Sequence, residues 1–373
     1  MALAGISEAD AAFVAQREAF LAKASEQYRS APVSLERLLG SPCLPLEPIV
    51  VDELASPGAR ACHLAGEAVS GSGSGVALLV PVRFDRRDGR LRHPLLALAA
   101  ALRAGADLGL PVAHPMEGHP EAVARFGQPD GTLKLYDLPI PEHVDKYREQ
   151  AETNELFAAH NDGLGYAGLI QHAVLTLDRA ALAGGYTYFT NLVALAPALA
   201  AADPAAFAAL FLPDAITAIR ARGKGAIRVT SPVFFLGRSG QPQVFFRIAS
   251  GEYVIEWRDH PALARARDIL ERVCAPFAPG SRFVQLMRPG DTVVINNRHV
   301  VHGRTAFIDP PDGGRVLARK WFVERAEDAV YRHVPGMAVH PRWAELFPQR
   351  FCGEAIEGEW HYDATTARNI KIK

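Results

Sequence analysis

One stretch of the sequence, residues 293–319, most narrows what the chain can fold into. It opens on an apolar, strand-like run (VVINNRHVV) and leads into a second one (VLARKWFV). The segment between them contains DPPDGG at residues 309–314, a turn that predicts a β-hairpin. Both runs carry histidines or arginines, which a dry core does not accommodate without partners. The stretch therefore predicts strands that present polar side chains to a site.

An upstream segment offers partners for these side chains. His160 and Asp162 are two residues apart in AAHND, and on an extended strand both project to the same face. With one distant histidine they would complete the two-histidine, one-carboxylate triad of non-haem Fe(II) oxygenases, which leaves coordination positions open. His299 and His302 compete for the third place. They are three residues apart, so strand alternation puts them on opposite faces.

The ordered series HND, GGYT, NNRHVVHGRTAF and GGRVLARKWF resembles the motif series of a known family. That family is the Fe(II)/2-oxoglutarate dioxygenases of the taurine dioxygenase and clavaminate synthase-like group, and the resemblance covers roughly residues 153–323. A single HxD triplet arises often by chance, so the ordered series is what carries the resemblance. It implies His160, Asp162 and His302 as the catalytic metal ligands, because the HGR of the series begins at His302.

The resemblance also implies how cosubstrate and substrate bind. Arg315 would clamp the distal carboxylate of 2-oxoglutarate, with Thr187 of GGYT as a second partner. The planar guanidinium offers two parallel donors to a carboxylate. Arg319 is four residues further on, so it returns to the same face and matches a position that binds an anionic substrate group in some members. A structural salt bridge is the alternative for Arg319. The implied cofactors are Fe(II), 2-oxoglutarate as cosubstrate, and O2.

Other polar residues near these motifs have simpler interpretations. His299 is expected to be packed or at the solvent edge, and His172, in the apolar run LIQHAVLTL, to be a core histidine. Arg304 suits a structural role as well as a role in the site. The glycine-bearing segments at residues 163–165 and 222–225 are candidates for mobile lids, with plain connections as the alternative.

Composition excludes several classes of function. The formal net charge is −1 and no dense run of Lys or Arg occurs, which argues against nucleic-acid binding. The first residues lack the basic region of a signal peptide, and no apolar run is long enough to cross a membrane. The four cysteines are scattered and form no CxxC pair. These features predict a reduced, cytoplasmic protein. The family resemblance implies a small-molecule substrate, and the oligomeric state stays open.

Many short strands, with helices clustered in the first third and in two insertions, predict a mainly β fold with α decoration around a double-stranded β-helix (jelly-roll) core. A single catalytic domain is expected over residues 1–373. Its parts would be an N-terminal helical and loop embellishment at about 1–75, the jelly-roll core at about 76–325 and a C-terminal extension at about 326–373. Helices are predicted at residues 7–28, 34–39, 94–104, 195–211 and 260–274, whereas 61–69 is ambiguous. Asp203 should cap the second part of the interrupted helix at 195–211, with Pro204 in its first position. Strands are predicted at residues 76–84, 165–176, 186–193, 233–236, 244–248, 253–257, 283–287 and 293–295.

The resulting hypothesis is a dioxygenase that hydroxylates an unactivated C–H bond of a small polar, amino-acid-like substrate in a specialised pathway such as antibiotic biosynthesis. Desaturation or cyclisation with the same cofactors is the first alternative. A non-catalytic jelly-roll protein that binds a metal or a ligand is the second, and a hydrolytic zinc enzyme the third. The intact triad together with Arg315 argues against the last two, since a clamp for a 2-oxo acid has no purpose there.

Overall fold

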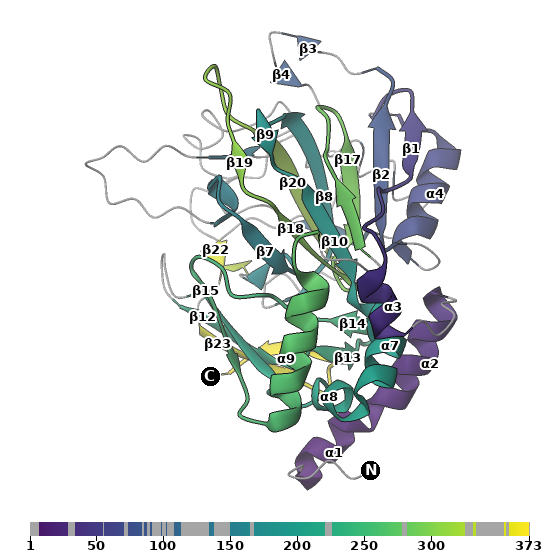
Figure 1. The fold of residues 1–373 in the computed structure, drawn as a ribbon, viewed down its shortest axis with the longest axis vertical. Helices are drawn as coiled ribbons and strands as arrows, with labels where there is room; N and C mark the ends of the chain where they lie inside the picture. Colours follow the sequence, from purple (N-terminus) through teal and green to yellow (C-terminus); the bar gives the residue numbers. More distant parts are fainter. Residues whose placement is uncertain are drawn as a thin grey trace, which may run out of the picture.

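The computed structural model describes most of the chain but leaves several segments undescribed. The described residues are 7–28, 34–54, 56–70, 74–83, 86–87, 90–91, 98, 102, 108–112, 134–137, 150–164, 168–220, 226–277, 282–324, 331–332, 354–355 and 358–372. The predicted helix at 94–104 falls almost wholly outside them, as do residues 165 and 222–225 of the two candidate lids. The described part is mainly β, with helices gathered toward one end and along one side (Figure 1).

The largest sheet has seven strands and contains the second apolar run of the stretch 293–319. Its strands are antiparallel except for the parallel pair at one edge, β1 and β2. The order is β1 (Pro48–Val51), β2 (Val76–Pro81), β17 (Thr292–Asn296), β8 (Ile170–Arg179), β20 (Val316–Val323) and β5 (Leu110–Val112), with β6 (Lys134–Tyr136) also paired to β20.

A second sheet has four antiparallel strands. Their order is β16 (Arg282–Gln285), β10 (Thr187–Asn191), β18 (Val300–Arg304) and β7 (Phe157–His160). The predicted hairpin across residues 309–314 is wrong, because β18 and β20 lie in different sheets. Both edges of β18 are occupied by β10 and β7, while β20 pairs along its length with β8. The short β19 (Phe307–Ile308), which precedes the turn, pairs instead with β9 (Ala183–Gly184).

Strand alternation divides the core into layers on the two faces of the seven-stranded sheet. Leu175 of β8 faces the four-stranded sheet and packs in one apolar cluster with Phe189 of β10. Its neighbour Val174 points to the opposite face and packs with residues of α4 (Ala59–Ser70). The seven-stranded sheet is therefore covered by the other sheet on one side and by a helix on the other, as the period of two along a strand requires.

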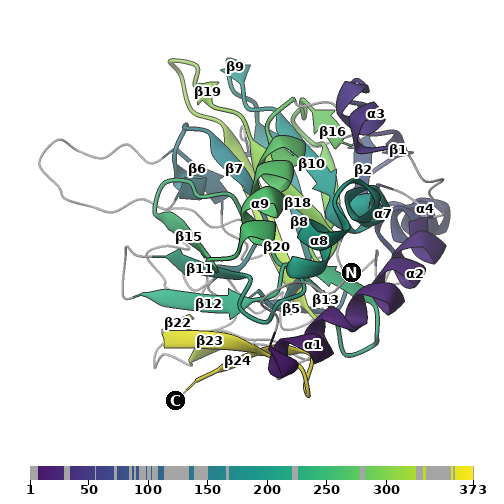
Figure 2. The ribbon, with the colours of Figure 1, turned by 60° about the horizontal axis from the view of Figure 1, so that its bottom comes forward.

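A third sheet and most of the helices form the lower end of the molecule in Figure 1, which comes forward in Figure 2. The sheet order is β15 (Tyr253–Trp257), β11 (Ile216–Arg220), β12 (Ile227–Ser231), β23 (Gly358–Asp363) and β24 (Arg368–Lys371), so the C-terminal segment belongs to this sheet. The helices are α1 (Glu8–Val14), α2 (Gln16–Tyr28), α3 (Leu35–Gly40), α7 (Leu192–Ala202), α8 (Pro204–Ala209) and α9 (Pro261–Cys274). A buried cluster that includes the rings of Phe20, Phe207, Phe211 and Phe234 joins them.

Local sequence signals account for several of these boundaries. The Asp203 carboxylate accepts a hydrogen bond from the Ala206 N–H at 2.8 Å, and Pro204 is the first residue of α8, as predicted. The ambiguous segment 61–69 lies in the helix α4. The remaining short elements are β3 (Arg86–Arg87), β4 (Arg90–Leu91), η2 (Gln150–Glu152), β13 (Phe234–Leu236), β14 (Pro242–Val244), β21 (Tyr331–Arg332) and β22 (Glu354–Ala355). No helix within the described ranges is long and apolar enough to span a membrane.

Candidate metal centre

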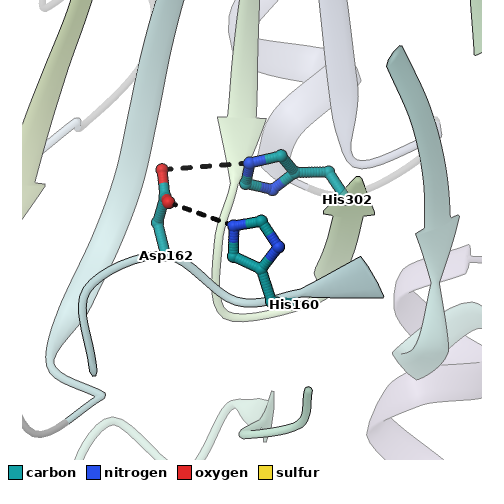
Figure 3. A group of neighbouring side chains, drawn as sticks. All are labelled: His160, Asp162 and His302. Atoms are coloured by element: carbon teal, nitrogen blue, oxygen red, sulfur yellow. Dashed lines mark ion pairs between the residues drawn. The ribbon is translucent and has the colours of Figure 1, made fainter. Parts of the chain in front are cut away.

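Three buried polar side chains meet where the four-stranded sheet faces the larger one. His160 ends β7, Asp162 follows two residues later, and His302 lies in the middle of β18, directly opposite His160 in the strand pairing. Figure 3 shows the two imidazoles and the carboxylate pointing toward one another. His160 Nε2 is 3.4 Å from Asp162 Oδ1, and His302 Nε2 is 3.9 Å from Asp162 Oδ2. One donor atom from each residue lies within 4.8 Å of the other two.

Two asparagines of the motifs hold this arrangement in place. The Asn297 side chain accepts the Asp162 N–H at 2.7 Å and donates to the Asp162 carbonyl at 3.1 Å. Asn161 donates to the carbonyls of Asn297 and Val300 at 2.7 and 3.0 Å. The loop after β7 is thereby fixed to the turn between β17 and β18. The sequence reasoning treated both asparagines only as letters of a motif, because their bonds cross between distant segments.

The protonation state of the cluster suits a metal ion. His160 Nδ1 lies 2.8 Å from the Ala158 carbonyl, which can only accept, so Nδ1 carries the proton and Nε2 keeps its lone pair. Burial lowers the pKa of His160 and lowers that of His302 to about 3. Burial alone would raise the pKa of Asp162, but the charge of Arg319 and the two imidazoles bring it far below its usual range. Two neutral imidazoles and one carboxylate are therefore available without further deprotonation.

The donor set also fits iron in its chemistry. Two imidazole nitrogens and one carboxylate are the donor set of the facial triad in non-haem Fe(II) oxygenases, and here they come from β7, the loop after it and β18. His302 Nδ1 is buried and has no hydrogen-bond partner among the described atoms. Unlike His160, whose backbone partner fixes its tautomer, His302 leaves its ring orientation to packing beside Phe189 and His160.

Two side chains of β20 donate hydrogen bonds to the carboxylate of Asp162. Arg319 Nη1 donates to Asp162 Oδ1 at 3.2 Å, and Trp321 Nε1 donates to Asp162 Oδ2 at 2.8 Å. The Arg319 guanidinium lies 4.0 Å from the centre of the Trp321 ring. The ion pair of Arg319 with Asp162 agrees with the structural salt bridge considered for this residue from the sequence, where its partner was not identified. Trp321 was not predicted to lie at the site. The signal was present, since Trp321 is one strand period beyond Arg319.

A pocket beside the triad contains the residues expected to bind the cosubstrate. Its lining includes Thr187, Arg304, Arg315 and Arg319 together with the three triad residues. Arg315 is 6% exposed, and no described residue accepts a hydrogen bond from its guanidinium. Burial lowers the pKa of Arg315 to about 10, even though Asp309 acts in the opposite direction. Arg315 is thus a largely buried cation that lines the pocket, and its guanidinium contacts no carboxylate among the described residues.

The other polar candidates have structural partners. Arg304 donates to the carbonyls of Thr153 and Glu155 at 2.7 and 2.6 Å, which anchors the segment that leads into β7. His299 Nδ1 is bonded to the Tyr28 hydroxyl, and His172 Nδ1 donates to the Leu108 carbonyl at 3.2 Å. Both histidines lie outside the cluster of three. Their positions agree with the interpretation of each as a packed residue.

Comparison with known proteins identifies the family. A sequence model of the family described as "Taurine catabolism dioxygenase TauD, TfdA family" matches residues 108–321, more than half of the chain. The chain belongs to this family. It is therefore a 2-oxoglutarate-dependent non-haem iron dioxygenase, whose cofactors are Fe(II), 2-oxoglutarate and O2. The family match ends at residue 321, two residues past Arg319.

Individual oxygenases are similar to this chain over much of its length. A uridine-5'-phosphate dioxygenase from Amycolatopsis sp. is 29% identical over 237 residues, which are 62% of this chain and 79% of the relative. The non-haem iron oxygenase OrfP, solved with Fe and α-ketoglutaric acid, superposes with a TM-score of 0.53 at 20% identity and covers 89% of this chain and 98% of its own. An asparagine oxygenase solved with Fe(II), 3-hydroxyasparagine and succinate gives a TM-score of 0.52 at 19% identity, with 89% and 97% covered. These superpositions establish a shared fold.

Proposed function

We propose that this dioxygenase hydroxylates an unactivated C–H bond of a small polar substrate, with His160, Asp162 and His302 as its iron ligands. The observation that carries the proposal is the convergence of their donor atoms within 4.8 Å, in the protonation state that a metal requires. When bound, Fe(II) together with 2-oxoglutarate and O2 supplies the oxidising chemistry, and the coproducts are succinate and CO2. Desaturation and cyclisation use the same cofactors and are the alternative outcomes.

The side chains around the triad have distinct tasks in this proposal. Arg315 forms the charge-assisted pair with the distal carboxylate of 2-oxoglutarate, and Thr187 adds a neutral donor. Both residues line the pocket that reaches the triad, so the cosubstrate would extend from them toward the metal ligands. Arg319 and Trp321 hold Asp162 in one orientation, as outer partners of metal-binding carboxylates do. Arg319 also remains our candidate for an anionic substrate group, through the part of its guanidinium not bonded to Asp162.

We further propose that the seven- and four-stranded sheets form the two halves of a double-stranded β-helix. The apolar cluster between them and the assignment of β17, β18 and β20 to alternate sheets support this. The chain would then be one catalytic domain, with its N-terminal helices and its C-terminal strands packed around the jelly roll. A cytoplasmic location stays a prediction from composition.

Two substrate classes deserve testing first. Amino acids are the first class, because hydroxylation of a small amino-acid-like molecule agrees with the expectation from sequence and with the chemistry named for the asparagine oxygenase that shares this fold. Nucleotides are the second class, because the matching curated relative acts on uridine-5'-phosphate. Both classes bring an anionic group together with a polar body into a site lined by arginines.

The test is an anaerobic titration of the apoprotein with Fe(II) and then with 2-oxoglutarate. A weak visible charge-transfer band should form, because the 2-oxo acid chelates the metal. Under air, a panel of amino acids and nucleotides should then include a compound that raises succinate formation and gains one oxygen atom by mass spectrometry. If no band forms and no compound raises succinate above the background rate, the proposed function is wrong.

A further inference from the structure

We infer that Arg247 is a specificity-determining residue that binds an anionic oxygen-bearing group, a carboxylate or a phosphate, of the prime substrate; this inference rests on the function proposed above. Arg247 is 4% exposed and follows β14. Its backbone forms an isolated antiparallel bridge opposite His160, with backbone hydrogen bonds of 2.8 and 3.0 Å on either side. Directly opposed residues of paired strands point to the same face, so the Arg247 side chain shares the face of the proposed iron ligand.

The guanidinium of Arg247 has no ionic partner among the described residues. Its Nε atom is buried and bonds no acceptor there. The ring of Tyr253 contacts it, with its centre 3.5 Å from the guanidinium carbon, and a hydrogen bond with Tyr253 also favours the charged form. The charges of Glu252 and Asp162 act in the same direction, but neither carboxylate forms an ion pair with Arg247, and one oxygen of Glu252 accepts the N–H of Gln150 at 3.2 Å. These contacts offset part of the cost of burying a cation, but they do not replace all the hydrogen bonds lost from water.

Arg247 differs in this respect from the other arginines of the site. Arg304 donates to two backbone carbonyls, and Arg319 is paired with Asp162. Arg315 faces the cosubstrate pocket and is assigned to 2-oxoglutarate. Arg247, unlike Arg319, has no carboxylate in contact among the described residues, so it is the first candidate for the substrate anion, and Arg319 could add only the donors that it does not use for Asp162. A buried, unpaired cation is costly, so its presence beside the ligands indicates a partner that arrives with a substrate.

The chemistry of that partner follows from the guanidinium. A planar fork of donors suits a carboxylate or a phosphate, and an ammonium or neutral group gains nothing from it. Because the backbone of Arg247 is bridged to that of His160, an anion bound at Arg247 would lie beside the proposed metal ligands.

The experiment uses the anaerobic Fe(II)–2-oxoglutarate complex of the full chain and matched pairs of probes. Each pair differs only in the anion: uridine-5'-phosphate and uridine, asparagine and asparaginamide. The readout is the probe concentration that shifts the charge-transfer band. The variants are Arg247→Met, Arg247→Lys and, as a control, Arg228→Met, which removes an exposed arginine from the third sheet. Thermal unfolding of each variant without ligands is measured in parallel.

An anionic probe should shift the wild-type band at a lower concentration than its neutral partner, and the pair that responds tells phosphate from carboxylate. Arg247→Met should weaken that response roughly a hundredfold, since it breaks a buried charge pair, with Arg247→Lys intermediate and the control unchanged. Arg247→Met should also unfold at no lower temperature than wild type, because it removes an unpaired buried charge.

Three results would overturn the inference. They are a wild-type band that no anionic probe shifts, an Arg247→Met variant that responds like wild type, and an Arg247→Met variant that melts earlier while keeping its anion affinity. The last would make the contact with Tyr253 purely structural. Failure of the wild-type protein to form any band with 2-oxoglutarate would instead contradict the proposed function itself.

Discussion

His299 ends the turn before β18, and His302 lies three residues later on that strand, yet the two rings differ in their hydrogen-bond partners. Both are buried, and burial lowers the pKa of each to about 3. The ring of His299 is bonded to the Tyr28 hydroxyl and lies 3.3 Å from the Asn296 amide. His302 has neither contact; its Nδ1 is unbonded in the described structure, and its Nε2 faces Asp162.

The comparison shows that neither burial nor a perturbed pKa distinguishes a functional histidine in this protein. What distinguishes the two is whether another described residue forms a hydrogen bond with Nδ1 of the ring. Nδ1 of His299 is bonded to the hydroxyl of Tyr28, which ends α2, and lies near the side chain of Asn296. The ring of His302 instead lines a pocket together with His160, Asp162 and the guanidinium groups of Arg315 and Arg319.

The largest expected effect comes from replacing each histidine by alanine. His302→Ala should abolish turnover and weaken Fe(II) binding by more than the 10- to 100-fold that loss of an outer partner typically costs. His160→Ala and Asp162→Ala should behave in the same way. His299→Ala should keep the metal and lose stability. Fe(II) affinity of the purified variants, measured anaerobically, would contradict the assignment if His299→Ala lost iron and His302→Ala retained it.

A second effect tests Arg315, whose guanidinium lines the pocket. Arg315→Ala should weaken 2-oxoglutarate binding roughly a hundredfold, because an orphaned carboxylate costs about 3 kcal/mol or more. Thr187→Ala is the matched control, since it removes one neutral donor worth about 1 kcal/mol, or about fivefold. Titration of the charge-transfer band gives both constants. Equal affinities in wild type and Arg315→Ala would remove the clamp from the mechanism.

A third effect tests the outer support of the carboxylate. Trp321→Phe keeps most of the ring and loses the donor to Asp162, so Fe(II) affinity should fall about tenfold. Trp360→Phe, in β23 of the third sheet, removes an indole N–H that has no acceptor among the described atoms, so it is the control and should leave the affinity unchanged. Comparable iron affinity in the two variants would show that Arg319 alone orients the carboxylate.

A fourth effect concerns His299 and appears as a pH dependence of the free energy of unfolding. Burial lowers the pKa of His299 from 6.5 to about 3, so between these values the unfolded chain binds a proton that the native chain does not. The unfolding free energy should therefore rise with pH across this window and fall on acidification, by at most about 1.4 kcal/mol per pH unit for this residue.

His299→Gln keeps a polar group near Tyr28 but removes the titration, so the slope of stability against pH should become shallower. The exposed His63, replaced by Gln, serves as the control. Urea unfolding of the metal-free protein at several pH values measures the slopes. Identical slopes in wild type and His299→Gln would show that His299 does not titrate as its burial requires.

The sequence predicted the bounds of individual strands and helices better than the contacts between distant segments. The strand at residues 253–257 was predicted at the bounds of β15, and Pro204 begins α8. The meeting of His160, Asp162 and His302 was also predicted, from spacing and resemblance together. The strand bounds and the helix start depend on periodicity and capping, which a short window of sequence contains. The meeting of the three residues depended on the family resemblance as well as on spacing.

Pairing across the chain could not be predicted in this way. The turn at 309–314 joins strands that enter different sheets, because the preferred neighbours of β18 and β20 come from elsewhere in the sequence. Arg247 was overlooked for the same reason. It belongs to no motif, and only the bridge between its backbone and that of His160 brings it to the site.

The bond between the Asp162 N–H and Asn297 has a consequence for how the protein folds. It closes a loop of 135 positions, and the proposed metal ligands His160, Asp162 and His302 come together only when chain segments this far apart meet. Contacts between such distant segments form slowly, because chain entropy is lost before the contact rewards it. The unfolded chain has no preassembled site, so iron binds the native state and stabilises it by about 2.7 kcal/mol at a hundred times its dissociation constant. Bound iron should therefore raise the free energy of unfolding and lower the fraction of unfolded chains that a protease can cut.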